Sequence, residues 1–415
     1  MPTLEEPKLL PSTGLIASLP ANPVIHTRDR ARNLAGWNWL LSRLSRETSS
    51  GRFIPEMDGL RFIATAMVIL FHLNGYLLAK SAHHSGSLPQ SDWLAQIALV
   101  GFRGVELFFV ISGFILGLPF AAHHLKNAPR VNLRTYYLRR LTRLEPPYFV
   151  TVLLLFVLAL WVQGKSAAGL YPHLAASLFY LHNLIYGLPS PAIGVAWSLE
   201  IEVQFYVLVP WLTLLFAIRR RWLRRLSLVT LILGTLSAQS LFLPLRGPLS
   251  LSILAYLQFF LIGFLLADVF LADWAEAPKT NPYWDVVAVA GWPLLFIVLR
   301  ADAVAHWIFP FLVFFLYCAA FRGAWSRQVF SNPCLTVVGG MCYSIYLIHY
   351  EVISAVGRFT RGIAEGGPFW LYLLVQSALI GTSILLVCGF YFVLLEKPCM
   401  SRNWPRRVWR RLQTT

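Results

Sequence analysis

Ten stretches of mostly apolar residues follow one another along this 415-residue chain, separated by short polar connections. A membrane-spanning helix needs about 20 such residues, and most of the stretches reach that length. They lie at residues 60–80, 93–120, 146–163, 196–218, 226–244, 249–270, 283–299, 303–321, 334–356 and 369–395. The pattern predicts an all-α, polytopic integral membrane protein with about ten transmembrane helices packed in one bundle.

One further apolar stretch, LYPHLAASLFYLHNLIYG at 170–187, is interrupted by His173, His182 and Asn183. If it crossed the membrane, every later connection would change sides, and the basic cluster Arg219–Arg225 would lie outside. We therefore interpret residues 170–187 as a partly re-entrant or lid-like segment on the outer side.

The charge distribution supports this topology. Hydrophobic residues make up 57% of the chain and charged residues 13%, which excludes an ordinary soluble domain. The net charge of +16 is also found in nucleic-acid-binding proteins, but here Lys and Arg gather in every second connection and near both termini. That is the positive-inside pattern. We expect contact with a lipid bilayer, no nucleic-acid partner, and both termini in the cytoplasm.

Three regions are predicted along the chain. Residues 1–50 read as a cytoplasmic N-terminal extension without a cleavable signal peptide, and within it 35–44 fits a short helix, either on the membrane surface or packed against the protein. Residues 51–400 form the membrane domain, and 401–415 a basic cytoplasmic tail. The five cysteines have no paired spacing, so neither a disulfide framework nor a metal site is predicted.

Ionisable residues inside the spans are the first functional candidates. Arg61 and His72 are eleven residues apart, so about 100° per residue returns both to one helix face, about 16 Å apart. With the predicted topology, His72, Glu202 and His349 fall near mid-depth or in the outer half of the membrane. Two imidazoles and a carboxylate at one level predict a general acid/base centre. Interhelical hydrogen bonding is the structural alternative for each of them.

A second candidate lies at the cytoplasmic boundary. Arg139, Arg140 and Arg143 occupy helical positions i, i+1 and i+4, so at least two of them can face one ligand. Guanidinium groups bind phosphates bidentately. Together with Arg61 these residues predict a polyanion site at the inner face, and anchoring to lipid headgroups is the alternative.

Short motifs in a fixed order carry a family resemblance. They are DGLR at Asp58–Arg61 followed by His72, FFVISGF at Phe108–Phe114, RLEPPY at Arg143–Tyr148, WSLEIEVQFY at Trp197–Tyr206, YSIYLIH at Tyr343–His349 and EKP at Glu396–Pro398. In this order the chain resembles the membrane-bound acyltransferase type 3 family of bacterial O-acyltransferases over residues 55–400. One departure is that Val203 follows Glu202 where many members have a second glutamate, so no role is implied for another carboxylate such as Glu200.

The resemblance implies an acyltransferase of the bacterial inner (cytoplasmic) membrane. It implies transfer of an acyl group, by default acetyl, from cytoplasmic acyl-CoA to a hydroxyl of a carbohydrate or glycolipid acceptor, such as an exported polysaccharide. Acyl-CoA is then a co-substrate, and no permanently bound cofactor is expected. The implied catalytic residues are His72, as general base or transient acyl carrier, with Glu202 and Arg61. The donor is expected at Arg139, Arg140, Arg143 and Tyr148, and the acceptor at Trp197, Ser198, Tyr206, Tyr343 and His349.

Two other classes of function fit the same charges. A transporter or flippase for a glycan intermediate would use them along a permeation route. It would move substrate without consuming acyl-CoA. A scaffold within a polysaccharide-assembly complex would need neither Arg61 nor His72 for acylation.

Overall fold

The computed structural model describes residues 35–47, 53–84, 92–241, 247–274, 278–298, 302–401 and 404. These residues form helices and connections without a strand, which confirms the all-α prediction. The predicted helix at 35–44 is present as α2 (Ala35–Leu44). Most of the predicted N-terminal extension and C-terminal tail lies outside the described residues, and the boundaries of both stay predictions. Residues 44–415 make up one unit, which holds all of the long helices.

Seven helical stretches among the described residues are long and apolar enough to cross a membrane, which supports the predicted membrane protein. They are built from α3 (Pro55–Lys80), α4 (Trp93–Leu99) with η3 (Val100–Arg103) and α5 (Gly104–Lys126), α6 (Leu133–Trp161), α9 (Trp197–Leu212) between η4 (Gly194–Ala196) and η5 (Thr213–Ala217), η6 (Gly247–Leu251) with α11 (Ile253–Ala272), α13 (Asp302–Arg322), and α17 (Phe369–Tyr391) with η7 (Phe392–Glu396) and α18 (Lys397–Met400).

The predicted count of about ten spans is not confirmed. The stretch predicted at 226–244 belongs to α10 (Arg221–Leu241), which begins with charged residues, and the one at 283–299 is α12 (Tyr283–Val298), with 16 residues. The stretch predicted at 334–356 is divided at Met341 into α15 (Pro333–Gly340) and α16 (Cys342–Thr360), with α14 (Ala324–Phe330) before them.

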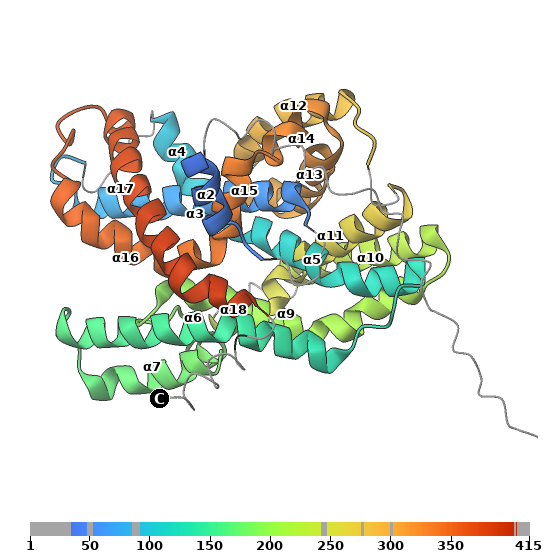
Figure 1. Cartoon of the computed structure of the whole chain (residues 1–415), viewed down its shortest axis with the longest axis horizontal. Coiled ribbons are helices and arrows are strands. Elements are labelled where there is room, and N and C mark those ends of the chain that lie inside the picture. Colours follow the sequence, from blue (N-terminus) through green and yellow to red (C-terminus); the bar gives the residue numbers. More distant parts are fainter. Residues whose placement is uncertain are drawn as a thin grey trace, which may run out of the picture. The chain divides into compact units, whose positions relative to one another are not determined.

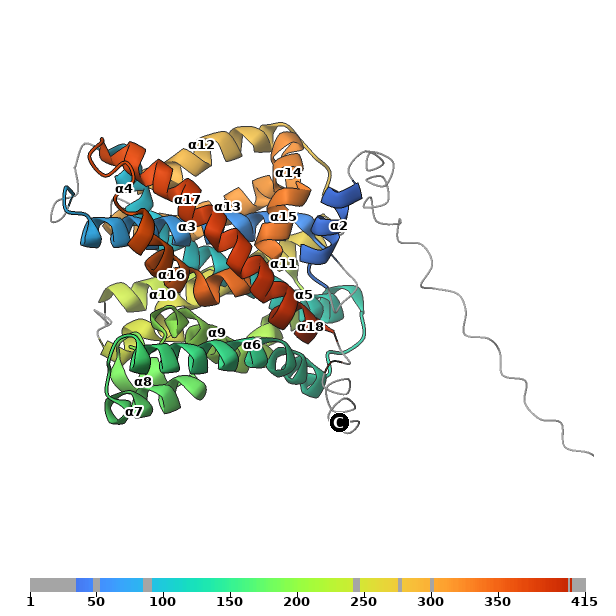
Figure 2. The same ribbon diagram turned by 60° about the vertical axis from the view of Figure 1, so that its left-hand side comes forward.

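The interrupted segment at 170–187 folds into two short helices, α7 (Ala167–Leu178) and α8 (His182–Tyr186). With 12 and 5 residues they are too short to cross a membrane as helices, in agreement with the prediction that this segment is not a span. Whether it is re-entrant or lid-like stays a prediction, and residues 167–187 are called the lid-like segment below. Figures 1 and 2 show α7 beside α6 at the bottom of the view, with α12 at the opposite side.

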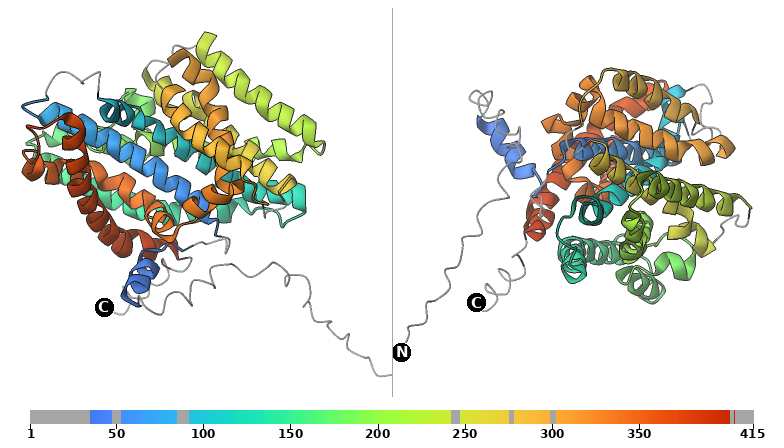
Figure 3. Two further views of the ribbon diagram at one scale, coloured as in Figure 1. Left: turned by 90° about the horizontal axis from the view of Figure 1, so that it is seen from above. Right: turned by 90° about the vertical axis from the view of Figure 1, so that its right-hand side faces the viewer.

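Helix α3 occupies the middle of the bundle, where it packs against α5, α15 and α16. Figure 3 shows α3, in blue, running alongside α5, in cyan. Because α3 carries both Arg61 and His72, this central position places both within reach of several other helices.

Two glycines allow α5 and α11 to pack with their backbones nearly in contact. A Cβ atom on Gly113 would lie 2.2 Å from the carbonyl oxygen of Phe260, and one on Gly263 would lie 2.3 Å from that of Val110. Small residues at helix crossings permit such close approach in membrane proteins. The side chains around the crossing are large and buried, and they include Phe114 and Phe264.

The start of α3 is fixed in the same way. A Cβ on Gly59 would meet the carbonyl oxygen of Phe330 at 2.0 Å, and one on Gly339 would meet that of Asp58 at 1.8 Å. The backbone that carries Asp58 is therefore held directly against α14 and α15.

We expect Gly113→Ala to destabilise the protein by about 1–3 kcal/mol, because the added methyl group forces α5 and α11 apart. The matched control is Gly234→Ala on α10, where a Cβ meets nothing within 4 Å. That variant should keep its stability or gain up to about 1 kcal/mol from helix propensity. Thermal unfolding in detergent measures both, and equal melting temperatures would contradict the close packing of α5 on α11.

Candidate active site

Two histidines from different helices meet inside the bundle. The Nε2 atom of His349 on α16 lies 3.0 Å from the Nδ1 atom of His72 on α3, and the ring centroids are 5.0 Å apart. His349 is buried and His72 is half-buried. The structure thus brings together two of the three residues that the sequence placed at one depth.

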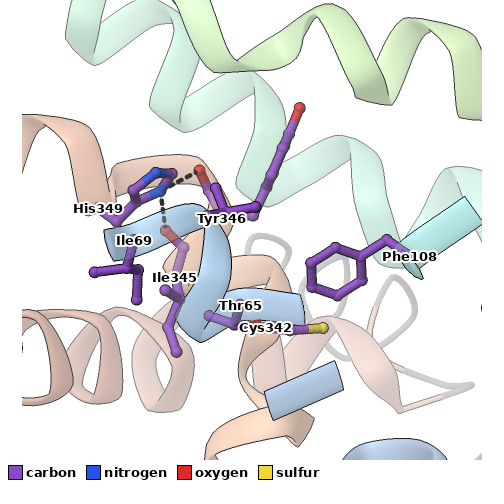
Figure 4. Close-up of a pocket in the computed structure, with 8 residues that line it drawn as sticks. Thr65, Ile69, Phe108, Cys342, Ile345, Tyr346 and His349 are labelled. Atoms are coloured by element: carbon purple, nitrogen blue, oxygen red, sulfur yellow. Dashed lines mark hydrogen bonds between the residues drawn. The ribbon is translucent and has the colours of Figure 1, made fainter. Parts of the chain in front are cut away.

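The other ring nitrogen of His349 fixes how protons are arranged in this pair. His349 Nδ1 lies 2.9 Å from the carbonyl oxygen of Ile345 and 3.0 Å from that of Tyr346, as Figure 4 shows. A carbonyl only accepts, so Nδ1 of His349 carries the hydrogen and Nε2 of the neutral ring is an acceptor. The contact with His72 then requires a hydrogen on His72 Nδ1. This leaves His72 Nε2 with a free lone pair, which suits a general base.

A small void lies beside the histidine pair, between α3, α5 and α16. Its volume is about 10 Å³, the scale of a single water molecule. Figure 4 shows Phe108 across from His349, with Thr65 and Cys342 on the lower side. The lining is nearly all apolar, and Thr65 lies one turn after Arg61 on α3. A substrate chain that passes from Arg61 to His349 has to displace some of these side chains.

Glu202 has partners of its own. The hydroxyl of Ser112 on α5 donates a hydrogen bond of 2.5 Å to Glu202 Oε1, and the hydroxyl of Tyr206 also bonds to this carboxylate. The sequence predicts that Glu202 orients either the acceptor or the imidazole of His72, whereas the contacts of His72 in the structure are with His349 and with the backbone of Val68. The role of Glu202 stays a prediction. Ser112 was missed as a site residue, although a hydroxyl in an otherwise apolar motif was a signal.

The first turn of α9 is tied to the histidine helix through Tyr346. The hydroxyl of Ser198 bonds to that of Tyr346 at 3.2 Å, and the Tyr346 hydroxyl in turn donates to the carbonyl of Val195. Tyr346 is also one of the residues whose carbonyl binds His349. The ring of Trp197 lies 5.7 Å from that of Tyr256 on α11. Ser198 thus reaches the histidine pair through Tyr346.

At the opposite end of α3, a buried carboxylate gathers two cations. Asp58 is fully buried, and it binds Arg46 Nε at 2.8 Å and also binds Arg61. Each of these side chains keeps only a small exposed part. The predicted cationic end of α3 therefore exists, and one carboxylate partly neutralises it.

The arginines of α6 differ in burial. Arg140 donates to the carbonyl of Tyr136 at 2.8 Å and lies over the Tyr136 ring at 3.6 Å and the Tyr206 ring at 5.4 Å. The Nε atoms of Arg140 and Arg143 are buried and have no hydrogen-bond partner. Arg139 is exposed. Among the three arginines of α6 that the sequence singled out, Arg140 and Arg143 thus offer buried, unused donors to a ligand, whereas Arg139 does not.

The closing EKP motif reaches the start of α16. Glu396 lies at the end of η7, a short π-helix, and accepts hydrogen bonds from the backbone N–H of Ser344 at 3.0 Å and from its hydroxyl at 2.5 Å. The hydroxyl of Tyr343 donates to the carbonyl of Leu144 at 2.8 Å and links α16 to α6. Its predicted contact with the acceptor stays a prediction.

Tyr148 and Glu200 hold the lid-like segment. The hydroxyl of Tyr148, predicted to bind the donor, donates to the carbonyl of Ser177 at 2.9 Å, and its ring stacks on Tyr180. Glu200 accepts a hydrogen bond of 2.8 Å from the backbone N–H of Asn183. Neither Tyr148 nor Glu200 makes any of these contacts with Arg140 or Arg143.

The lid also contains a histidine pair. His173 Nδ1 lies 2.8 Å from His182 Nε2, and His182 Nδ1 lies 3.0 Å from the carbonyl oxygen of Leu188. Burial lowers the pKa of His182, and the bond to Leu188 only partly offsets this. The His182 ring therefore stays neutral at pH 7, as its role as acceptor from His173 requires.

A helical membrane bundle with an imidazole pair inside and a cationic cluster at one end is an arrangement suited to group transfer. The profile described as an acyltransferase domain matches residues 54–392, and the chain belongs to this acyltransferase family.

Curated relatives are similar over the same region. A Staphylococcus aureus (strain COL) protein, provisionally named an O-acetyltransferase, is 27% identical over 74% of this chain and 52% of its own. The peptidoglycan O-acetyltransferase OatA of Listeria monocytogenes is 27% identical over 74% of this chain and 50% of its own. O-acetyltransferase OatA of Staphylococcus aureus (strain NCTC 8325) is 26% identical over 86% and 58%. The chain thus spans about half the length of these relatives. No solved structure matches it significantly.

We expect Asp58→Asn to cost about 3–5 kcal/mol of stability, because it leaves the guanidinium groups of Arg46 and Arg61 buried without their carboxylate. Asp273→Asn is the matched control. Of its two partners, Arg221 is 61% exposed, and Arg225 keeps a second carboxylate, that of Asp268, so that change should cost about 1 kcal/mol or less. Chemical denaturation in micelles measures both, and similar losses would show that Asp58 does not organise the start of α3.

Proposed function

We propose that this protein is a membrane O-acetyltransferase that moves acetyl groups from cytoplasmic acetyl-CoA to a hydroxyl of a carbohydrate on the outer side of the bacterial inner membrane, with both termini cytoplasmic. The main support for this proposal is the contact between His72 and His349, which leaves a free lone pair on His72 Nε2 inside the bundle. The names of the relatives support acetyl as the transferred group, and the name of the Listeria protein supports a cell-surface glycan as the acceptor.

In this proposal the donor binds at Arg61, Arg140 and Arg143. Arg140 and Arg143 have buried, unpaired Nε atoms, and Arg61 lies on the turn of α3 before Thr65. The phosphates of coenzyme A match guanidinium groups in charge and geometry. From Arg61 to His72 the helix rises about 16 Å, a distance that the thin, uncharged pantetheine arm is suited to bridge. The thioester then passes the small void, where Ile69 and Phe108 move aside.

The transfer step needs one base. His72 Nε2 takes the proton from the acceptor hydroxyl while its oxygen attacks the thioester carbonyl carbon. A C–O bond forms, the C–S bond breaks, and the coenzyme A thiolate leaves with the proton returned by the imidazolium. His349 accepts the hydrogen bond from His72 Nδ1–H and so holds the ring in the required tautomer and orientation. Glu202, fixed by Ser112, counterbalances the charge of the neighbouring Arg140.

For donor binding, we expect Arg140→Gln and Arg143→Gln each to raise the donor KM about 10- to 100-fold, since one charged hydrogen bond contributes about 1.5–3 kcal/mol. The effect should shrink at high salt, and the acceptor KM should barely change. Arg139→Gln is the control, because its exposed side chain lies one position away on the same helix. Steady-state kinetics in nanodiscs measure the donor KM of each variant. Donor KM values of Arg140→Gln and Arg143→Gln that equal those of the wild type and of Arg139→Gln would refute the donor site.

For catalysis, we expect His72→Ala to lower kcat about 100-fold or more, because it removes the base. His349→Leu should lower kcat, whereas His349→Gln should keep part of it, since the amide oxygen still accepts from His72 Nδ1–H. The double variant of His72→Ala and His349→Leu should be no slower than His72→Ala alone. Acetyl transfer by folded His72→Ala at the normal rate would exclude the mechanism.

A further inference from the structure

A second group of polar side chains surrounds a cavity that the proposed transfer step leaves unused. Its volume is about 160 Å³, enough for several water molecules or one sugar ring. The cavity lies between the end of α10 and the starts of α5, α11 and α13. The polar and aromatic groups that matter in its wall are Arg103, Glu106, Gln239, Tyr256, Gln258 and His306.

The ion pair in this wall has an unused donor and an unused acceptor. Arg103 Nη1 donates to Glu106 Oε1 at 2.7 Å, but Arg103 Nε and Glu106 Oε2 are buried without hydrogen-bond partners. Glu106 is only 5% exposed. A buried polar atom without a hydrogen-bond partner destabilises the protein. Both atoms therefore favour a ligand with hydroxyl groups, because a hydroxyl donates and accepts.

The remaining polar groups are neutral. Gln239 Nε2 donates to Gln258 Oε1 at 3.0 Å and to the carbonyl of Leu254 at 2.6 Å, while Gln258 Nε2 donates to the carbonyl of Ala255 at 3.0 Å and to Gln239 Oε1 at 3.4 Å. The second lone pair of each amide oxygen remains as an acceptor for a hydroxyl group. His306 Nε2 lies 3.0 Å from the carbonyl of Leu236, so it carries the hydrogen and leaves Nδ1 as an acceptor. The ring of Tyr256 adds an aromatic surface.

The balance of charge selects the class of ligand. The one guanidinium in the wall is already neutralised by Glu106, so a phosphate or carboxylate gains little there. Mixed donors and acceptors beside an aromatic ring match a neutral polyhydroxyl compound. We propose that this cavity binds one neutral sugar ring of the acceptor.

Two chains of side-chain contacts lead from the cavity towards the histidine pair. Phe102, next to Arg103, lies 5.8 Å from Phe71, whose ring lies 5.2 Å from that of His72. On the other side, Tyr256 contacts Trp197, and the neighbouring Ser198 binds Tyr346 on the histidine helix. The backbone on both sides of Arg103 packs against the middle of α3, since a Cβ on Gly101 would meet the carbonyl oxygen of Met67 and one on Gly104 would meet that of Ala64. A sugar bound in the cavity would thus be linked to the histidine pair through these side chains, and its role as acceptor rests on the function proposed above.

The test uses the full-length protein in nanodiscs, with methyl glucoside and methyl mannoside as neutral probes and glucose 6-phosphate as the charged one. Gln239→Ala and Gln258→Ala should each weaken binding of a neutral glycoside about 2- to 10-fold, as expected for one neutral hydrogen bond. Gln96→Ala is the control, because Gln96 is a half-buried glutamine on α4 that does not line the cavity. Gln258 is buried, so its substitution affects folding more than that of Gln239. The Gln239 variant therefore keeps the test decisive if the Gln258 variant does not fold.

Binding is measured first without donor, by tryptophan fluorescence, since Trp197 contacts Tyr256 in the cavity wall. Acetyl transfer to the same glycosides then gives the acceptor and donor KM values. Weaker glycoside binding or a raised acceptor KM in both cavity variants, with normal values in the control, supports the proposal. If the wild type binds glycosides but transfers no acetyl group, the function proposed above fails while the cavity assignment stands. Failure of every glycoside to bind the wild type, equal binding by all variants, or tighter binding of glucose 6-phosphate would overturn the assignment.

Discussion

The fully buried carboxylate of Asp58 is the interaction on which the rest of the structure depends. It holds Arg46 and Arg61 at one end of α3, while Gly59 and Gly339 bring the same turn into backbone contact with α14 and α15. Charges in a low-dielectric interior are tolerated only with a partner. Once this end of α3 is fixed, helical geometry alone sets His72 about 16 Å further along the same face.

The remaining buried polar groups orient the other helices around α3. Ser112 joins α5 to Glu202 on α9, and Ser344 joins α16 to Glu396. The pair of Arg224 and Asp268 joins α10 to α11. Apolar surfaces pack in many rotational settings, whereas a hydrogen bond between two helices is satisfied in few. These contacts therefore specify which face each helix turns towards the histidine pair.

Periodicity and charge predicted the depth of each polar residue but not its neighbour. They placed His72 and His349 at one level, and the structure shows them in contact. They did not show that Glu202 pairs with Ser112, or that Tyr343 and Tyr148 link helices through backbone carbonyls. A single sequence shows which residues share one face of a helix. Which side chain of another helix each of them contacts depends on packing across the whole bundle. The break at Met341 was also missed, because α15 and the start of α16 read as one continuous, mostly apolar stretch in the sequence.

Charge also distinguishes the proposed donor site from the proposed acceptor cavity. Arg140 and Arg143 have buried Nε atoms without hydrogen-bond partners, whereas the cavity contains the neutralised pair of Arg103 and Glu106 and two amides. In the proposed mechanism the donor phosphates therefore bind at the α6 arginines, because they would gain little beside a guanidinium group that is already neutralised. A neutral sugar would gain no ionic contact at these arginines. The apolar lining of the void beside His349 suits the uncharged arm of the donor, so the proposed mechanism brings the acyl carbon, and no charged group, to His72.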